Sequence, residues 1–187
     1  MRDMGLLVLR ATAGGLLAGH GAQKLFGAFG GHGLQGTAGW LESLELRPGK
    51  QWAMLAGGSE FVGGIMTAIG LGGGLGPITT FGPMGMAIGK AHWGKPIWVT
   101  SGGAELPVTN VAIATALLLA GPGRYSLDEA LGIKVPRPLI GLALAGTLLG
   151  VAYGVTRRPQ PNPQQQQEAG AKLQSDNSQV AQPAAAS

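Results

Sequence analysis

The sequence contains no cysteine and few charged residues. With no cysteine among its 187 residues, disulfides, thiolate zinc sites, cysteine-ligated iron–sulfur clusters and CxxC redox pairs are excluded from this chain. Asp, Glu, Lys and Arg make up only 12% of it, whereas a soluble domain usually has about 25%. So little charge is not typical of a soluble globular domain.

The few charges sum to a positive value. The formal net charge is +4 and the sequence pI is about 9.8, values that a nucleic-acid-binding protein could also have. The basic residues, however, stand at the ends of apolar segments rather than along one face, which is typical of the cationic flanks of membrane helices. We therefore expect the lipid bilayer, and no nucleic acid, as a partner.

Long apolar runs dominate most of the chain. A membrane-spanning helix needs about 20 mostly apolar residues, and five segments meet or approach that length: residues 5–26, 52–71, 75–93, 104–121 and 139–156. The third segment is the weakest, because it contains Pro77, Pro83 and Lys90. The pattern predicts an all-α, polytopic helix bundle that crosses the cell membrane several times and has its termini on opposite sides.

Glycine is abundant, with 35 residues, and part of it recurs at intervals of four. Three groups have this spacing: Gly15 and Gly19, Gly85 and Gly89, and Gly146, Gly150 and Gly154. Small residues four apart share a helix ridge and let two helix backbones approach closely. We expect these three ridges to be packing surfaces rather than sites of chemistry.

The composition changes abruptly after Arg157. The remaining stretch, "RPQPNPQQQQEAGAKLQSDNSQVAQPAAAS", has no aromatic residue and is rich in Gln, Pro, Ala and Ser. Such a segment cannot bury enough apolar surface to offset the entropy that it would lose on ordering. The sequence therefore predicts three parts: a four-helix bundle over residues 1–135, an additional transmembrane helix in 136–158, and a disordered tail in 159–187.

Polar residues from several predicted helices lie in one half of the membrane. If the spans alternate in direction, the half distant from the N-terminus contains His20, Lys24, Glu60, His92 and Glu105. His20 and Lys24 are four residues apart and share a helix face. A charge at the centre of the membrane costs at least about 2.5 kcal/mol, so a carboxylate partner is expected. We predict Glu60 as the first partner of Lys24 or His20, Glu105 as the second, and an intramembrane polar site that includes all five residues.

Arg10 lies in the other half of the first segment. Its expected partner is Asp128 or Glu129, because the stretch "GPGRYSLDEA" falls on the N-terminal side of the membrane, and Asp3 is a weaker choice. The alternative is that Arg10 extends its side chain to that surface. We predict a structural ion pair between Arg10 and Asp128. The loop motif around it comprises Gly121, Pro122, Gly123, Arg124 and Asp128.

Four stretches of the chain stand in an informative order: "LRATAGGLLAGHGAQKLFGAFGGHGLQGTAGWLESL", "LAGGSEFVGG", "GGAELPVTN" and "GPGRYSLDEAL". Together, over about residues 6–131, they resemble the DoxX family of small bacterial membrane proteins. The resemblance implies a four-helix membrane bundle. The positions that it marks are His20, Lys24, Glu60, Glu105, Arg124 and Asp128. The chain departs from the family pattern by its helix in residues 139–156 and by its Gln- and Pro-rich tail.

The resemblance also implies functions. Some DoxX members are associated with quinone-linked oxidation of sulfur compounds, or with membrane complexes that handle thiol and oxidative stress. By this resemblance we expect a subunit of a membrane redox complex, with a quinone as its ligand, a protein partner in the membrane and no metal. His20, Lys24 and Glu60 would supply hydrogen-bond donors and protons to the quinone head.

Two other functions fit the same residues. A membrane scaffold or assembly factor without chemistry fits the glycine-rich packing, and its polar cluster would be a structural ion-pair network. A small-solute permease fits a charged interior that lines a path, although five short helices make a small transporter unless they oligomerise. A bis-histidine haem would need His20 and His92 at one depth, which their positions disfavour. The substrate, the orientation in the membrane, a homo-oligomer and catalytic activity are left open.

Overall fold

The computed structural model describes residues 1–157, 167 and 170–175. Within them the chain is all-α and has no β-strand, as the sequence predicts. Residues 1–157 form one compact unit, and 158–187 fall into a second. Of the predicted tail, residues 167 and 170–175 are helical. The others lie outside the described residues, so the disorder of that tail stays a prediction.

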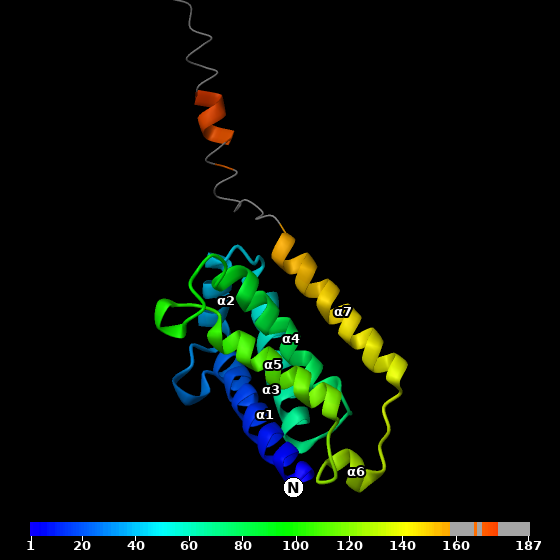
Figure 1. Ribbon diagram of the computed structural model, residues 1–187. Coiled ribbons are helices and arrows are strands. Elements are labelled where there is room, and N and C mark those ends of the chain that lie inside the picture. Colours follow the sequence, from blue (N-terminus) through cyan, green and yellow to red (C-terminus); the bar gives the residue numbers. More distant parts are fainter. Residues whose placement is uncertain (158–166, 168–169, 176–187) are drawn as a thin grey trace, which may run out of the picture. The chain divides into compact units, whose positions relative to one another are not determined.

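The helices of residues 1–157 correspond closely to the predicted apolar segments. In chain order they are α1 (Arg2–Phe26), η1 (Ala28–Gly30), α2 (Gly33–Ser43), α3 (Gly49–Ile69), α4 (Leu75–Met86), the π-helical segment η2 (Ala87–Ala91), η3 (Val99–Ser101), α5 (Glu105–Ala120), α6 (Leu127–Leu131) and α7 (Arg137–Thr156). The five predicted segments are α1, α3, α4 with η2, α5 and α7, whereas α2 and α6 are not among the predictions. In Figure 1, α7 runs along the edge of the bundle, and α2 and α6 lie at opposite ends.

Glycine residues bring α1 and α3 into backbone contact. A Cβ atom on Gly14 would lie 2.4 Å from the amide nitrogen of Ala68, and one on Gly21 would lie 2.3 Å from that of Phe61. Neither position has room for a side chain. The close approach of these two helices therefore depends on glycine.

The prediction that Gly15 and Gly19 form a packing surface is wrong. A Cβ atom on either residue would meet no atom within 4 Å. Both are turned by about 100° or more around the helix axis from the face that Gly14 and Gly21 present to α3. Spacing in the sequence identifies a ridge, but it does not tell on which side of the helix the partner lies.

Glycine also shapes the contact between α4, with its extension η2, and α7. A Cβ atom on Gly85 would lie 2.8 Å from Cγ1 of Val151, and one on Gly89 would lie 2.5 Å from Cγ2 of Val155. The two valines thus sit directly over the two glycines. The predicted packing role of Gly85 and Gly89 is confirmed.

The third predicted ridge, on α7, is confirmed only in part. A Cβ atom on Gly154 would lie 2.6 Å from Sδ of Met86, whereas one on Gly146 or Gly150 would meet no atom within 4 Å. Gly154 is thus a packing residue. Gly146 and Gly150 instead border the cavity described below.

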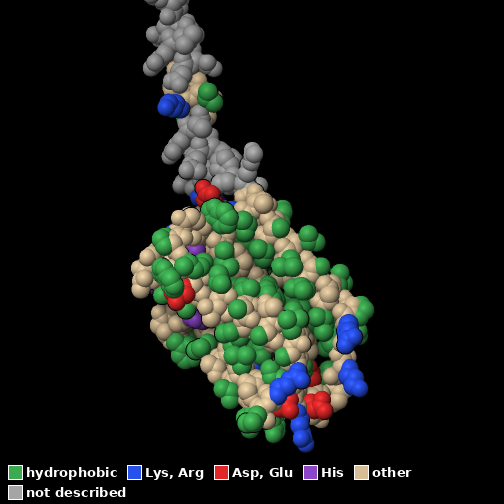
Figure 2. Space-filling model, in the orientation of Figure 1, with side chains coloured by type: hydrophobic (Ala, Val, Ile, Leu, Met, Phe, Trp, Pro, Cys, Tyr) green, Lys and Arg blue, Asp and Glu red, His purple; other side chains and the backbone are tan. Residues whose placement is uncertain are grey.

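Charged side chains are buried in the bundle and many apolar ones are exposed. Arg10, Glu60 and Asp128 are 3%, 1% and 4% exposed, whereas Leu119 of α5 and Leu149 of α7 are 82% and 71% exposed. On the face shown in Figure 2, hydrophobic side chains are spread over the area between the ends, and charged side chains gather mainly at the end near α6. This distribution is the reverse of that in soluble proteins and suits a lipid environment.

Length and composition alone single out one membrane-spanning helix among the described residues. α7 is long and apolar enough to cross a bilayer, and α5 is a shorter apolar helix. α1 and α3 have 25 and 21 residues, but polar side chains such as Arg10 and Glu60 lower their hydropathy. The structure thus establishes an all-α bundle.

Candidate functional site

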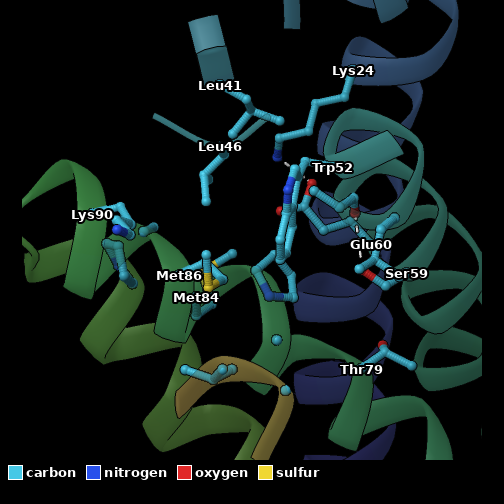
Figure 3. Close-up of a pocket in the computed structure, with 18 of the residues that line it drawn as sticks. Lys24, Leu41, Leu46, Trp52, Ser59, Glu60, Thr79, Met84, Met86 and Lys90 are labelled. Atoms are coloured by element: carbon cyan, nitrogen blue, oxygen red, sulfur yellow. Dashed lines mark hydrogen bonds and ion pairs between the residues drawn. The ribbon is translucent and has the colours of Figure 1, made fainter. Parts of the chain in front are cut away.

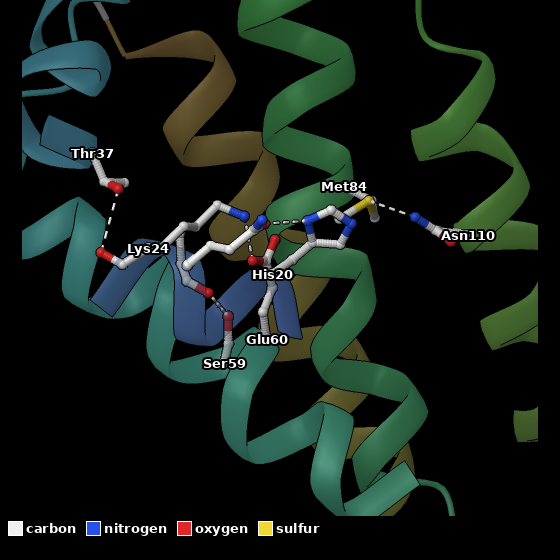
Figure 4. Close-up of polar contacts among 9 residues, drawn as sticks. His20, Lys24, Thr37, Ser59, Glu60, Met84 and Asn110 are labelled. Carbon is white, nitrogen blue, oxygen red and sulfur yellow. Dashed lines mark hydrogen bonds and ion pairs between the residues drawn. The ribbon is translucent and has the colours of Figure 1, made fainter. Parts of the chain in front are cut away.

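An ion pair joins α1 to α3 inside the bundle. Nζ of Lys24 forms a salt bridge with Oε2 of Glu60, as predicted, and Figure 4 shows the two side chains meeting. The side chain of Glu60 is 1% exposed and that of Lys24 is 26% exposed. Gly57 packs under the end of α1, because a Cβ atom there would lie 2.8 Å from the side chain of Leu25 and 3.2 Å from Cβ of Lys24. The buried carboxylate therefore has the opposite charge that its burial requires.

The end of α1 is held by α2. Oγ1 of Thr37 donates a hydrogen bond to the carbonyl oxygen of Lys24 at 3.3 Å. The chain turns off α1 at Gly27, whose φ of 71° is in the left-handed region that favours glycine. Because α2 is not among the sequence predictions, this support for Lys24 is a finding of the structure.

A cavity of about 870 Å³ lies beside the ion pair. Its wall comes from α1, α2, α3, α4 with η2, α5 and α7, and most of the side chains that line it are apolar (Figure 3). Its polar lining includes His20, Lys24, Thr37, Ser59, Glu60, Lys90 and Asn110. Ligand pockets typically measure about 300–1,000 Å³ and combine an apolar wall with a few polar groups. The cavity therefore has the size and the lining of a ligand site.

His20 lines this cavity, but its hydrogen bond goes to Gln23 rather than to Glu60. Nδ1 of His20 lies 3.0 Å from Oε1 of Gln23, and Nε2 of Gln23 donates to the carbonyl oxygen of Phe29 at 3.4 Å. Because an amide oxygen only accepts, Nδ1 holds the imidazole proton in this arrangement.

His92 and Glu105 are not part of the same site, which corrects the five-residue prediction. Nδ1 of His92 lies 2.7 Å from the carbonyl oxygen of Gly102, and Oε2 of Glu105 accepts the amide proton of Val99 at 2.8 Å. Neither residue lines the cavity. The helix ends in η2 just before His92, and the chain from there to Glu105 folds on itself, so both side chains bond within that connection.

Other cavity residues are absent from the predicted site. Nδ2 of Asn110 lies 3.6 Å from Sδ of Met84, a weak acceptor, so the amide of Asn110 keeps most of its hydrogen-bonding capacity. Lys90, on η2, lines the cavity and donates to the carbonyl oxygen of Arg157 at 3.3 Å. The sequence could have identified Lys90 as a site residue, because it is a charged residue inside an apolar segment. Nothing in the sequence indicates the π-helical turn that orients its side chain.

The predicted ion pair between Arg10 and Asp128 is not formed. Nη2 of Arg10 donates to the carbonyl oxygen of Tyr125, while Nε and Nη1 have no hydrogen-bond partner among the residues that the structure describes. The carboxylate of Asp128 instead accepts the amide protons of Gly72 at 2.8 Å and Gly73 at 2.5 Å. The turn after α3 presents these two amides to Asp128, and they satisfy its charge in place of Arg10.

The loop motif that precedes Asp128 is a structural element at the N-terminal end of the bundle. Gly121 and Gly123 have φ of 77° and 76°, which favours glycine at both. The amide of Arg124 donates to Oδ1 of Asp3 at 3.3 Å, and Oγ of Ser126 accepts the amide proton of Glu129 as the N-cap of α6. The motif thus ties α6 to the start of α1 and to the turn after α3.

An all-α bundle with buried charges, an apolar exterior and an internal cavity is the architecture of a helical membrane protein. Residues 5–93 match the DoxX family model, so this segment of the chain is a DoxX domain. No curated protein and no solved structure matches the chain. The matched segment runs from α1 to the end of η2 and contains the ion pair, whereas α5, α6 and α7 lie beyond it. The DoxX match supports association of this protein with a membrane.

Proposed function

We propose that the protein crosses the membrane with α1, α3, α4 and its extension η2, α5, and α7. Consecutive helices in this set run in opposite directions, and their connections alternate between the two ends of the bundle. The charges of Arg10 and Glu60 lower the mean hydropathy of α1 and α3. Both side chains are buried inside the bundle and would not meet lipid. Their burial supports membrane passage for these helices, because lipid would meet only their apolar faces.

The cavity beside Lys24 and Glu60 is proposed to bind a membrane-soluble compound with a polar carbonyl head, of which an isoprenoid quinone is the type. The observation that carries this proposal is a single charged pair in the wall of a mainly apolar cavity of about 870 Å³. The ammonium of Lys24 has three donors, of which Glu60 takes one, so it can also donate to a ligand carbonyl. Glu60 and His20 can exchange protons with the reduced form of the ligand.

In this role the protein would be a subunit of a membrane redox complex. The chain has no cysteine and supplies proton-exchanging groups rather than thiols, so electrons would have to pass to a partner protein. The membrane scaffold and the small-solute permease remain the competing functions. A scaffold requires only that the ion pair stabilise the bundle, and a permease requires net movement of a solute through the cavity.

The test is a binding measurement with a short-chain ubiquinone in detergent, followed by quenching of tryptophan fluorescence, since Trp40 and Trp52 line the cavity. Gly150 lines the cavity, and a Cβ atom there would meet no atom within 4 Å. Gly150→Leu should therefore fill part of the cavity and weaken binding about tenfold or more, through loss of a few contacts worth roughly 1.4 kcal/mol. Gly141→Leu is the matched control, because Gly141 has free space around it and does not line the cavity.

Each outcome of this experiment favours one function. Quinone binding that Gly150→Leu abolishes and Gly141→Leu preserves supports the redox subunit. Stable, folded protein that binds no quinone favours the scaffold. Uptake of a solute into vesicles that contain the protein, in the absence of quinone binding, favours the permease.

A further inference from the structure

The cavity has a second polar edge, distant from the ion pair. Lys90 of η2 and Tyr153 of α7 line it there, and in Figure 3 Lys90 lies across the cavity from Lys24 and Glu60. Nζ of Lys90 donates to the carbonyl oxygen of Arg157 at 3.3 Å. The guanidinium of Arg157 lies 5.9 Å from the centre of the Tyr153 ring. Two cationic side chains thus stand together at the end of the seam between α4 and α7.

This edge has no acidic counterpart in the described part of the chain. Among the described residues, the salt bridge of the cavity joins Lys24 to Glu60, on its other side. Neither Lys90 nor Arg157 has a carboxylate of the described residues within ion-pair distance. Lys90 is partly buried, and its one carbonyl contact leaves two of its three ammonium protons without an acceptor among the described residues. A partly buried ammonium in an apolar wall favours an anion supplied from outside the chain.

The wall between this edge and the centre of the cavity is apolar and made of small residues. Gly146 and Gly150 of α7 line it, and a Cβ atom on either would meet no atom within 4 Å. Ala143 and Met86 continue the same wall from the two helices. The space beside the glycines therefore accepts a flexible hydrocarbon chain that begins next to Lys90.

We propose that this edge binds an anionic amphiphile, with its phosphate or carboxylate on Lys90 and one hydrocarbon chain along the seam between α4 and α7. The charge of the edge and the chemistry of the seam complement the two parts of such a molecule. Tyr153 and Trp52, which also line the cavity, are residue types that favour the level of lipid headgroups. The proposal rests on the membrane placement proposed above, but it does not need a quinone or a redox reaction.

The experiment uses the full chain, delipidated in a neutral detergent, and measures its affinity for added amphiphiles by the rise in thermal unfolding temperature. The probes are phosphatidylglycerol, phosphatidylcholine, palmitate and inorganic phosphate. We expect phosphatidylglycerol or palmitate to bind at least about fivefold more tightly than phosphatidylcholine, the factor that one lysine contributes at a lipid surface. Phosphatidylglycerol identifies a lipid headgroup as the anion, and palmitate identifies a free carboxylate.

Two sets of variants separate the parts of the site. Lys90→Gln should remove the preference for the anionic amphiphile and Lys90→Arg should keep it, while Lys50→Gln, at an exposed position outside the cavity, should leave it unchanged. Gly150→Leu should weaken binding of every amphiphile, and Gly141→Leu should not.

Three results would overturn the proposal. One is an equal affinity for phosphatidylcholine and the anionic amphiphiles. Another is an effect of inorganic phosphate alone as large as that of the amphiphiles, since the hydrocarbon chain would then have no part. The third is an affinity for the anionic amphiphiles that Gly150→Leu leaves unchanged, which would place the lipid on the outer surface instead of the cavity. Quinone binding by Lys90→Gln, measured in parallel, reports on the proposed function separately.

Discussion

Gly14 of α1 and Gly64 of α3 meet backbone to backbone. A Cβ atom on Gly14 would lie 2.6 Å from the carbonyl oxygen of Gly64, and one on Gly64 would lie 2.7 Å from the carbonyl oxygen of Gly14. The contact is reciprocal, so neither helix can gain a methyl group without moving the other. Lys24 and Glu60 extend from the same two helices, so the glycine contact and the ion pair both hold α1 against α3.

The first prediction follows from this contact. Gly64→Ala should lower the free energy of unfolding by about 1–3 kcal/mol, the usual cost of excess volume in a packed interior. Gly58→Ala, on the same helix, is the control, since a Cβ there meets no atom within 4 Å. It should leave stability unchanged or raise it by up to about 1 kcal/mol through helix propensity. Thermal unfolding in detergent measures both, and an equal loss in the two variants would contradict the packing argument.

The second prediction concerns Lys24 and Glu60. Lys24→Met and Glu60→Gln should each lower stability, because breaking a buried pair typically costs about 3–5 kcal/mol. The double variant should recover part of the loss, since no unpaired charge remains. Thermal unfolding of all four proteins gives the coupling energy, and strictly additive losses would show that the two residues do not interact.

Quinone binding by the same variants distinguishes a role of the ion pair in the ligand site from a purely structural role. If the pair serves the redox role, the double variant should regain stability but not quinone binding. Recovery of both would favour the scaffold.

The third prediction concerns Asp128, which accepts two backbone amides from the turn after α3. Asp128→Asn keeps one acceptor oxygen and replaces the other with a donor amide, so one charge-assisted bond is lost. We expect a destabilisation of about 1–3 kcal/mol. Glu129→Gln is the control, because Glu129 is the exposed neighbour. Equal stability of the two variants would show that Asp128 does not hold this turn.

The sequence indicates how deep in the membrane each helix and polar residue lies, but it says less about the direction in which a side chain points. The apolar runs locate α1, α3, α4, α5 and α7 within a few residues, since each needs a continuous apolar length. The pairing of Lys24 with Glu60 follows from the cost of charge in lipid and from the adjacency of the two helices. His92 and Glu105 are at a suitable depth, but depth does not tell whether a side chain points into the bundle or bonds within its own loop.

Some features could not be predicted because they depend on backbone details. Gly33–Ser43 is short and rich in glycine, so helix α2 resembles a loop in the sequence. The amides of Gly72 and Gly73 compete with Arg10 for Asp128, and no pattern of side chains shows this. The cavity likewise arises where α7, at Gly146 and Gly150, lacks side chains to fill the space.

The fourth prediction tests passage through the membrane. Because the chain has no cysteine, single-cysteine variants report one position each. Lys50→Cys, at the start of α3, and Ser101→Cys, in η3, lie at one end of the bundle, and Lys134→Cys lies in the connection before α7 at the other end. All three positions are exposed. A membrane-impermeant maleimide added to intact cells should label either the first two or the third, but not both sets. Labelling of all three from one side would show that the helices do not span as proposed.

The fifth prediction separates α7 from the tail. A chain that ends after Arg158 should remain in the membrane fraction with unchanged stability, since the composition of the removed segment cannot form a packed core. A chain that ends after Pro136 also loses α7, which lines one wall of the cavity. Its remaining helices should still fold, because the glycine contact between α1 and α3 and the Lys24–Glu60 pair do not involve α7.

The two truncated proteins should therefore differ in ligand binding rather than in folding. The shorter chain should bind a short-chain ubiquinone about tenfold or more weakly than the longer one, since one apolar wall is replaced by detergent or lipid and the lost contacts are worth at least roughly 1.4 kcal/mol. Helical circular dichroism and membrane fractionation establish that both chains fold and insert, and tryptophan quenching measures binding. Equal affinity would mean that the ligand sits against α1 and α3 alone. Loss of the shorter chain from the membrane would mean that α7 is required for insertion and not only for the cavity.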